Sequence, residues 1–445
     1  MNKVAVAVPP PAAAIAAPIA SDAPDVAQEP PSGRSARKAT QLKQIVAAAD
    51  GAGPRVQPLD LTKKRKFDAA PARAPSPSRK QRRMAFVCNM RPQNTLTQGP
   101  DDEFEEFDSP ATIQALANLF GREGYSVSIL EADRSLPRRL ANGHFDLVFN
   151  MAEGRGGRCR EALVPALCEL LGLAYTGSDP LTFAATLDKA VAKRLIVSDV
   201  ATPRWLLARS VADLAQFDLT FPVFAKPNDE GSSKGIGDDS KCSNFRELES
   251  RVAHLLESYG RPVLIEEFVR GSEVTVSIIG NKCPEVIGLM QVIPTGDEGQ
   301  DFVYSLQCKR DYQNRVRYAI PPELPADTCA RVAEAALKCY RLLDCRDVSR
   351  VDFRVAADGT PYFIECNPLP GLSPISGDLV LTARAMGWSW DQLVARIVHE
   401  AEFRQGVLRP VLVGDRVRRQ DPQSPQRRKP QPRLAVPQAL PRAKQ

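Results

Sequence analysis

The spacing of apolar residues separates a structured middle, residues 84–405, from two tails that show no sustained period. In the first part of the middle, short apolar runs typical of strands alternate with segments whose apolar residues recur every three or four positions, as in amphipathic helices. The predicted strands are 84–88, 125–130 and 145–150, and the predicted helices are 163–171 and one that Ser109 caps and Pro110 begins. This alternation predicts a Rossmann-like domain over residues 84–180, with a parallel sheet between helices.

The pattern changes near residue 181, where the regular alternation stops. We expect two further units there, 181–270 and 271–405, so that the predicted fold class is α/β followed by α+β. The predicted helices are 181–197, 245–259, 328–343 and 390–403, and the predicted strands are 221–226, 263–268, 273–280 and 285–293.

Residues 349–370 predict a β-hairpin that gathers polar side chains on one face. Asp358 and Gly359 favour a two-residue turn, because both tolerate the positive φ that such turns need. Folding the chain about this turn pairs Asp352 with Glu365 and Arg350 with Asn367. Since side chains alternate along a strand, these four share one face. The opposite face is predicted to be apolar, with Val351, Phe353, Ile364 and Cys366.

Two carboxylates that face each other across a hairpin need a compensating cation, because like charges in directly opposite positions repel. Asp352, Glu365 and Asn367 offer the hard oxygen ligands that suit magnesium or manganese. The alternative is a solvated strand face on which Arg350 neutralises both acids. The hairpin alone does not distinguish these two interpretations.

A glycine- and serine-rich loop, GSSKGIG over residues 231–237, follows the strand that ends at Lys226. Its glycines would let a ligand approach the backbone, and consecutive N–H groups can form an anion-binding nest. The loop lacks the GxxxxGK pattern of a Walker loop, and such loops are also common as flexible turns. Lys189 and Lys226 would add point charges for phosphates.

Acidic residues on the next strand could bind the rest of a nucleotide. Glu266, Glu267 and the main chain of Val269 could contact an adenine edge, and Glu273 could reach a ribose. Each of these residues could equally be an ordinary surface charge. Two lysines, a Gly/Ser loop, a glutamate-bearing strand and an acid/acid/amide hairpin are together far more specific than any one part.

Charge is distributed unevenly along the chain, whose formal net charge is +6. Residues 1–83 carry a net charge of +9 and residues 406–445 carry +8, which leaves the middle at −11. We predict that both tails are disordered. The basic clusters at 63–66 and 79–83 could serve nuclear import or contact a polyanion such as nucleic acid, or could simply belong to a basic tail.

Cysteine usage and hydropathy exclude several classes of protein. The ten cysteines are scattered and form no CxxC pair, which excludes a zinc ribbon or a dense disulfide scaffold and fits a reducing, cytoplasmic compartment. No run of eighteen apolar residues exists, so we expect no membrane span. Prolines interrupt the alanine-rich N-terminus too early for a convincing signal peptide.

The motifs of residues 84–405, in their order and spacing, resemble those of ATP-grasp carboxylate–amine ligases, and most closely the D-alanine–D-alanine ligase family. The matching segments are 175–178, 187–189, 226–235, 266–273, 350–353 and 365–371. The resemblance implies an ATP-grasp fold in which ATP lies between two α+β halves. It also implies a reaction in which a carboxylate is phosphorylated to an acyl phosphate, which an amine then attacks to give an amide.

The resemblance implies a role for each matching residue. The metal ligands would be Asp352, Glu365 and Asn367, holding two ions of magnesium or manganese. The ATP-binding residues would be Lys189, Lys226, Glu230, Gly231, Ser232, Ser233, Gly235, Glu266, Glu267, Val269 and Glu273. The residues acting on the reacting groups would be Arg350 and the Gly371 N–H, with Ser376 at the carboxylate of the second amino acid and Lys309 on a mobile loop.

The substrate end departs from the family pattern. The family has a His-Gly before a Gly-Glu-Asp-Gly segment, whereas residues 153–161 here read EGRGGRCRE. Arg158 and Arg160 could bind carboxylate or phosphate groups of a substrate, or pair with Glu153 and Glu161. The loop tyrosine of the family is Arg310 here, and the family's N-terminal glutamate falls somewhere near 106–108.

Three functions therefore remain open. The first is a D-alanine–D-alanine ligase-like enzyme, and the second is a ligase of the same superfamily that acts on another amino acid or a peptide. The third is a non-catalytic nucleotide-binding protein or a carrier for basic tails, which the complete set of metal and phosphate positions argues against. The partners would be small amino-acid or peptide substrates, and a homodimer is possible because the family often forms one.

Overall fold

The computed structural model describes residues 81–92, 101–297 and 299–407. Most of the two predicted tails, including the basic cluster 63–66, lies outside these residues. Within them, no helix is long and apolar enough to cross a membrane. The second basic cluster is partly folded, because the first strand already begins at Arg82, whose guanidinium binds Glu402 and lies 4.4 Å from the centre of the Tyr125 ring. This arginine therefore packs against the folded body, and its contacts do not support a nuclear-import role.

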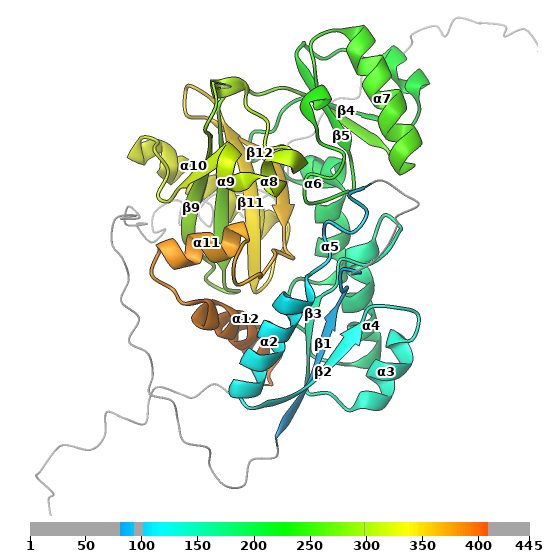
Figure 1. Ribbon diagram of the computed structural model, residues 1–445, viewed down its shortest axis with the longest axis vertical. Helices are drawn as coiled ribbons and strands as arrows, with labels where there is room; N and C mark the ends of the chain where they lie inside the picture. The colour runs from blue at the N-terminus through cyan, green and yellow to red at the C-terminus, as the bar shows by residue number, and fades with distance from the viewer. Residues whose placement is uncertain (1–80, 93–100, 298, 408–445) are drawn as a thin grey trace, which may run out of the picture. The chain divides into compact units, whose positions relative to one another are not determined.

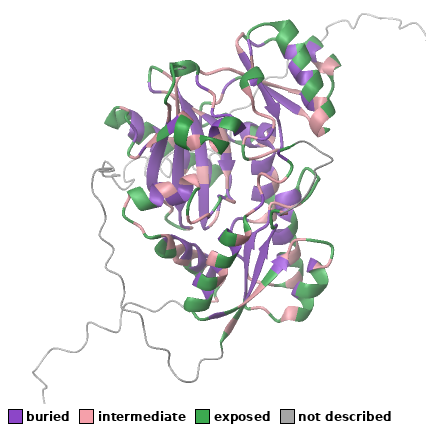
Figure 2. Cartoon of the chain, viewed as in Figure 1, coloured by how far each residue is buried: buried purple, intermediate pink, exposed green. Residues whose placement is uncertain are grey.

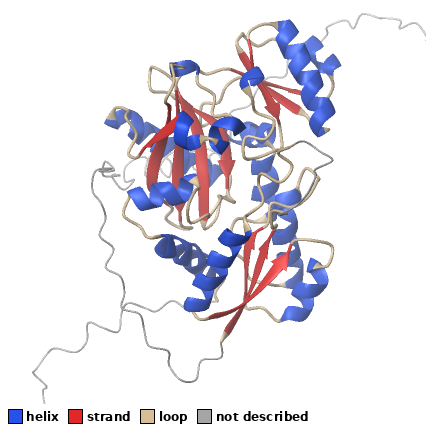
Figure 3. Cartoon of the chain, in the orientation of Figure 1, coloured by secondary structure: helices blue, strands red, loops and turns tan. Residues whose placement is uncertain are grey.

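The first sheet is parallel, as the sequence predicts, and its strands have the order β2-β1-β3 (Figures 1 and 3). Its strands are β1 (Arg82–Cys88), β2 (Tyr125–Glu131) and β3 (Leu147–Met151), and its helices are α2 (Pro110–Arg122), α3 (Leu136–Gly143) and α4 (Leu163–Leu171). Ser109 caps α2 by accepting a hydrogen bond from the Thr112 N–H at 3.1 Å. Only α3 has no counterpart among the predicted elements.

The predicted helix 181–197 is two helices, α5 (Pro180–Leu187) and α6 (Lys189–Ile196). Asp188 interrupts them in an extended conformation, and its carboxylate accepts a hydrogen bond from the Val191 N–H at 3.0 Å. Asp188 is therefore the N-cap of α6, and a new helix can begin there because its side chain satisfies one of the free N–H groups of the first turn. The break places Lys189 in the first turn of α6.

The second sheet is antiparallel, has the order β4-β7-β5-β6 and packs against α7 (Phe245–Tyr259). Its strands are β4 (Trp205–Ala208), β5 (Val223–Pro227), β6 (Lys241–Cys242) and β7 (Val263–Glu267). The sequence predicts β5, β7 and α7 but not the two short edge strands. Figure 2 shows these strands as largely buried, whereas the outer surface of α7 is exposed.

The third sheet is antiparallel, with the order β10-β9-β8-β11-β12. Its strands are β8 (Ser272–Ile279), β9 (Glu285–Pro294), β10 (Val316–Ala319), β11 (Val348–Val355) and β12 (Pro361–Asn367). The helices around it are α8 (Leu306–Arg310), α9 (Tyr312–Arg315), α10 (Ala326–Leu342), α11 (Asp378–Ala385) and α12 (Trp390–Arg404). Of these elements, β10, α8, α9 and α11 are absent from the prediction.

Side-chain alternation gives the third sheet two different faces. One face buries apolar residues of β8, β11 and β12 under α10. The other face carries Glu273, Thr275, Arg350, Asp352 and Arg354, all of which line a pocket. The sheet therefore supports a polar site on a rigid apolar base.

The hairpin register is confirmed at the polar positions, although the predicted turn is wrong. Asp352 lies opposite Glu365 and Arg350 opposite Asn367, but nearer the turn the register shifts by one residue. The loop is longer than two residues, because the Ala356 N–H donates to the Thr360 carbonyl at 3.0 Å. A bulge at Ile364 absorbs the difference, and Ile364 lines the pocket instead of joining the predicted apolar face.

Asp347 joins three parts of the fold and carries a prediction about stability. Its fully buried carboxylate accepts hydrogen bonds from the Gly177 N–H at 2.8 Å, from Asn281 at 3.0 Å and from Arg404 at 2.8 Å and 3.0 Å. We expect Asp347→Asn to lower the free energy of unfolding by about 3 kcal/mol, because it leaves Arg404 without its counter-charge. Urea denaturation measures this loss. The matched Asp344→Asn change, at an exposed position nearby, should cost less than about 0.5 kcal/mol, and an equal cost would contradict the prediction.

Candidate active site

The two carboxylates on the polar face of the hairpin, Asp352 and Glu365, have different partners. Arg350 donates to both oxygens of Asp352, at 3.1 Å and 3.0 Å, and also pairs with Asp378 at 3.2 Å. Glu365 instead pairs with Lys189, with 3.2 Å between Nζ and Oε2. Arg350 is therefore not the only cation beside the two facing acids, because Glu365 also has a lysine partner.

The two carboxylates also differ in their acidity. Burial raises the pKa of Glu365, but the surrounding Lys189 and other cations outweigh this effect and hold the pKa well below its usual range. Burial raises the pKa of Asp352 above its usual value despite the neighbouring Arg350. Asn367 donates to Asp352 at 3.0 Å, so the acid/acid/amide set that the sequence predicts is assembled. Two carboxylates and an amide on one face are oxygen donors that fit a hard divalent cation.

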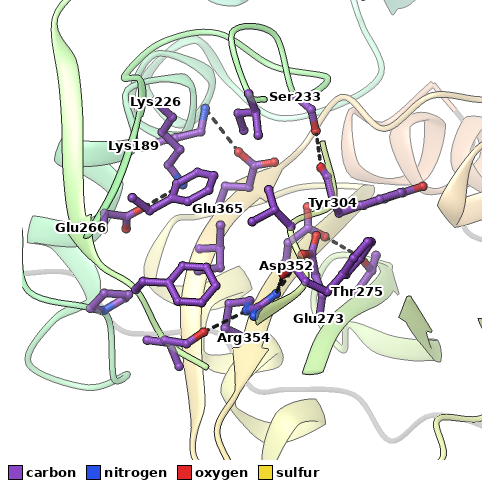
Figure 4. A pocket seen from close by; sticks show the side chains of 18 of the residues that line it. Lys189, Lys226, Ser233, Glu266, Glu273, Thr275, Tyr304, Asp352, Arg354 and Glu365 are labelled. Atoms are coloured by element: carbon purple, nitrogen blue, oxygen red, sulfur yellow. Dashed lines mark hydrogen bonds and ion pairs between the residues drawn. The ribbon is translucent and has the colours of Figure 1, made fainter. Parts of the chain in front are cut away.

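Three buried lysines and Glu266 lie beside the hairpin, and Figure 4 shows Lys189, Lys226 and Glu266 among them. Lys226 pairs with one oxygen of Glu266 at 2.7 Å, and Lys193 pairs with the other at 2.6 Å. Lys189 donates to the carbonyl oxygen of Glu230 at 2.6 Å. Both oxygens of Glu266 are thus engaged by lysines, although Glu266 still lines the pocket. The sequence analysis missed Lys193, and its position one helical turn after Lys189 was the available signal.

The Gly/Ser loop has the backbone conformation of an anion-binding nest. Ser232, Ser233 and Gly235 have φ values of +49°, +59° and +66°, in the left-handed region. The Gly231 N–H donates to Glu106 at 2.9 Å, and the Gly235 N–H donates to Asp102 at 3.0 Å. Carboxylates of the acidic segment 101–108 therefore occupy N–H groups that the sequence assigns to phosphate. Their presence shows that this loop can bind anions.

The pocket on the polar face of the third sheet, called the first pocket below, is also lined by aromatic rings and a buried arginine. Phe224 and Phe268 lie with their ring centres 6.3 Å apart, and Arg354 lies 5.2 Å from the centre of the Phe268 ring. Arg354 also donates to the Val269 carbonyl at 3.1 Å and pairs with Glu273 at 3.5 Å. These aromatic side chains and Arg354 are further lining residues that the sequence analysis missed.

Of the remaining predicted nucleotide ligands, Glu267 and Glu273 line this pocket, whereas Gly231, Ser232 and Gly235 do not. Glu267 lies at its edge, paired with Arg204 at 3.1 Å, and burial raises the pKa of Glu273 above its usual value. Together the lining residues include the predicted Lys189, Lys226, Glu230, Ser233, Glu266, Glu267, Val269, Glu273, Lys309, Arg350, Asp352 and Glu365. The structure thus brings together residues that are dispersed over the sequence.

A second pocket adjoins the first and shares part of its wall. The shared residues are Lys189, Glu230, Lys309, Arg350 and Glu365. Gly231, Ser232, Asn367, Gly371 and Ser376 line only the second pocket. The two pockets therefore meet at the predicted metal and phosphate positions, which is the arrangement needed to pass a group from a ligand in one to a ligand in the other.

The arginines of the divergent segment have partners that the sequence analysis did not predict. Arg158 pairs with Asp188 at 2.6 Å. Arg160 pairs with Glu106 at 2.8 Å and donates to the Asp229 carbonyl at 2.6 Å. Neither arginine forms an ion pair with Glu153 or Glu161 among the described residues, and neither lines either of the two pockets.

The acidic segment also bounds the second pocket. Glu105, Glu106 and Asp108 all line this pocket, and of these Glu106 contacts the Gly/Ser loop. Arg310, at the place of the family's loop tyrosine, pairs with Asp101 and Glu105, both at 3.0 Å. The segment therefore links the Gly/Ser loop to α8.

Comparisons with known proteins agree with this geometry. A family model for the D-ala D-ala ligase C-terminus matches residues 200–399. A D-alanine–D-alanine ligase of Synechococcus sp. (strain JA-3-3Ab) is 32% identical over 301 residues, covering 66% of this chain and 88% of the relative. An uncharacterized protein of Sinorhizobium fredii is also 32% identical, over 59% of this chain and 77% of its own.

A solved structure extends the agreement to the fold. The D-alanine–D-alanine ligase from Bacillus anthracis complexed with ATP superposes with a TM-score of 0.56 at 21% identity, covering 73% of this chain and 99% of that one. The predicted ATP-grasp fold is thereby confirmed. The chain belongs to the D-alanine–D-alanine ligase family, and it is an ATP- and divalent-metal-dependent ligase that forms C–N bonds between small molecules.

Proposed function

We propose that this protein phosphorylates the carboxylate of one amino acid with ATP and joins it to the amino group of a second. The observation that carries the proposal is the shared wall of the two pockets, where Lys189, Arg350 and Glu365 meet. ATP would occupy the first pocket and the amino acids the second. The three units 84–180, 181–270 and 271–405 would supply the parts of this site.

The roles of the nucleotide-binding residues follow from their places in the first pocket. Lys189 and Lys226 would hold phosphates, with Glu266 and Lys193 fixing the position of Lys226. The loop residues would donate N–H and O–H groups to the phosphates after the acidic segment yields its hydrogen bonds: Glu230, Gly231, Ser232, Ser233 and Gly235. Glu267 and Val269 would lie at the adenine, and Glu273 at the ribose.

Asp352, Glu365 and Asn367 would hold one or two divalent ions, of which magnesium and manganese suit the oxygen donors best. When bound, such ions neutralise charge on transferring phosphates. The γ-phosphoryl group passes to a substrate carboxylate oxygen, giving an acyl phosphate and ADP. The second amino group then attacks the acyl carbon, loses a proton and expels inorganic phosphate.

The other residues of the shared wall would act on these reacting groups. Arg350 and the Gly371 N–H would stabilise negative charge as it develops on the acyl group. Ser376 would bind the carboxylate of the second amino acid, and Lys309 on α8 would lie over the phosphates. D-alanine is the default substrate by relationship. The departure at residues 153–161 favours a different amino acid or a peptide as the second candidate.

Two further features concern the setting of the reaction. All ten cysteines are free and eight are buried, which fits a reducing compartment such as the cytoplasm. A homodimer would agree with the habit of the family.

Phosphate release from ATP with magnesium, measured across single and paired amino acids, tests the proposal. A signal with D-alanine that Glu365→Gln abolishes would establish the dipeptide ligase. Turnover with another amino acid or peptide and not with D-alanine would establish the second candidate. Nucleotide binding without turnover across the whole panel would overturn both and favour a non-catalytic protein.

A further inference from the structure

The second pocket contains three carboxyl groups that face one another. Glu106, Glu153 and Glu161 each place one oxygen within 4.8 Å of the others. They come from the acidic segment before α2, from the loop after β3 and from a short 3₁₀ turn over Arg160–Ala162. All three line the pocket. A site with donors from three separate segments is a property of the tertiary fold.

Only one of the three carboxylates has a counter-charge. Glu106 accepts the Gly231 N–H at 2.9 Å and pairs with Arg160 at 2.8 Å and Lys234 at 3.3 Å. Within the described residues, no hydrogen bond or ion pair joins the side chain of Glu153 or Glu161 to another group. Glu161 is only 8% exposed, and its carboxyl lines the pocket without a hydrogen-bond or ion-pair partner among the described residues. A cationic ligand would stabilise such a largely buried carboxyl by supplying both charge and hydrogen bonds.

The neighbouring cations Arg160 and Lys189 offset the rise in the pKa of Glu161 only in part, because both are engaged by other carboxylates. Arg160 is committed to Glu106 and the Asp229 carbonyl, and Arg158 is turned to Asp188. Asp108 is a further carboxyl in the lining of the same pocket. Burial followed by repulsion from neighbouring acids raises the pKa of Glu153 well above its usual value, and burial raises the pKa of Glu161 to about 7. A bound cation would relieve both effects.

We propose that the amino acid whose carboxylate is phosphorylated carries a second cationic group besides its α-ammonium, as a diamino acid does. Glu153 and Glu161 would bind this second group. The inference rests on the proposed function, since it names the substrate class of the same site. A simple amino acid brings one positive charge, whereas two carboxyls of the cluster, Glu153 and Glu161, have no ion-pair partner among the described residues. Residue 153 is a glutamate where the family has a histidine, so the preference would belong to this chain.

The test compares pairs of amino acids that differ only in the terminal charge of the side chain. D-ornithine is matched with D-norleucine, and D-2,4-diaminobutyrate with D-norvaline, each alone and each with D-alanine, with the L-enantiomers measured in parallel. We expect kcat/KM for phosphate release to be about tenfold or more higher for the cationic member of each pair. Glu153→Gln should remove most of that preference, and Glu153→His should reverse it towards neutral side chains. Glu249→Gln, at an exposed position of α7, is the matched control and should leave the ratio unchanged.

Each outcome decides between distinct conclusions. If the neutral partners are used equally well, or if both Glu153 variants keep the preference, the cationic-substrate proposal fails while the ligase function stands. If no amino acid is turned over, the proposed function fails, and calorimetric binding of D-ornithine and D-norleucine to the wild type and to Glu153→Gln still tests the cationic site. If manganese titration of the nucleotide-free protein shows an ion that Glu153→Gln releases, the cluster is a metal site and the proposal is overturned.

Discussion

Glu365→Gln is expected to lower kcat/KM for ATP-dependent phosphate release by about 10³-fold. The substitution keeps the shape of a side chain that lies between Lys189 and the amide of Asn367, but it removes the charge. A neutral amide binds a divalent ion far more weakly than a carboxylate whose pKa the surrounding cations hold well below its usual range. The loss should therefore appear in turnover and in the magnesium dependence of nucleotide binding.

Steady-state phosphate release and calorimetric titration of ATP at several magnesium concentrations measure these two effects. The variant should need more magnesium to bind ATP, whereas Glu249→Gln should behave as the wild type in both assays. Turnover within threefold of the wild type, with unchanged magnesium dependence, would show that Glu365 does not hold the metal. The melting temperature of each variant excludes a loss of folded protein as the cause.

The polar hairpin shows what the sequence can predict and why. A turn signal and strict alternation are local properties, so pairing Asp352 with Glu365 required no knowledge of the rest of the fold. The turn is nevertheless longer than predicted, and the bulge at Ile364 compensates for it by one residue. The longer turn and the bulge offset each other, so the register at Asp352 and Glu365 is the predicted one. The bulge itself was not predicted, and it places Ile364 in the pocket lining.

The charge partners at the substrate end show what the sequence cannot predict. Arg160 lies next to Glu161 along the chain, which suggested a local pair, but its actual partner is Glu106, 54 residues away. The acid that Arg160 contacts is set by the way the acidic segment folds over the Gly/Ser loop. The spacing of apolar and polar residues carries no information about such a long-range contact. The same holds for Lys193 on α6, whose partner Glu266 lies on β7, 73 residues further along the chain. Of the two alternatives that the sequence left open, pairing with acids is the one observed, but the acids are Asp188 and Glu106 rather than Glu153 and Glu161.

Arg350→Lys is expected to lower kcat by about 10²- to 10³-fold while changing the binding of ATP little. Arg350 lies on the shared wall of both pockets, and its guanidinium spans Asp352 on β11 and Asp378 at the start of α11. A lysine keeps the positive charge but lacks the planar fork, so it cannot hold both carboxylates and still face the acyl group. A purely electrostatic role would tolerate this change, whereas a positioned donor to developing negative charge would not.

The separation of kcat from KM tests this role of Arg350. Positional isotope exchange in labelled ATP reports formation of the acyl phosphate before the second amino acid reacts, and it should slow in step with kcat. Lys338→Arg, at an exposed ion pair with Asp199 on the outer surface of α10, is a matched control for exchanging the two cations and should change neither quantity. A rise in KM for ATP with kcat unchanged would place Arg350 in nucleotide binding alone. Loss of exchange with ATP binding intact would instead locate its contribution at the first chemical step, because a donor that acts only on the charge of the transition state leaves ground-state affinity unaltered.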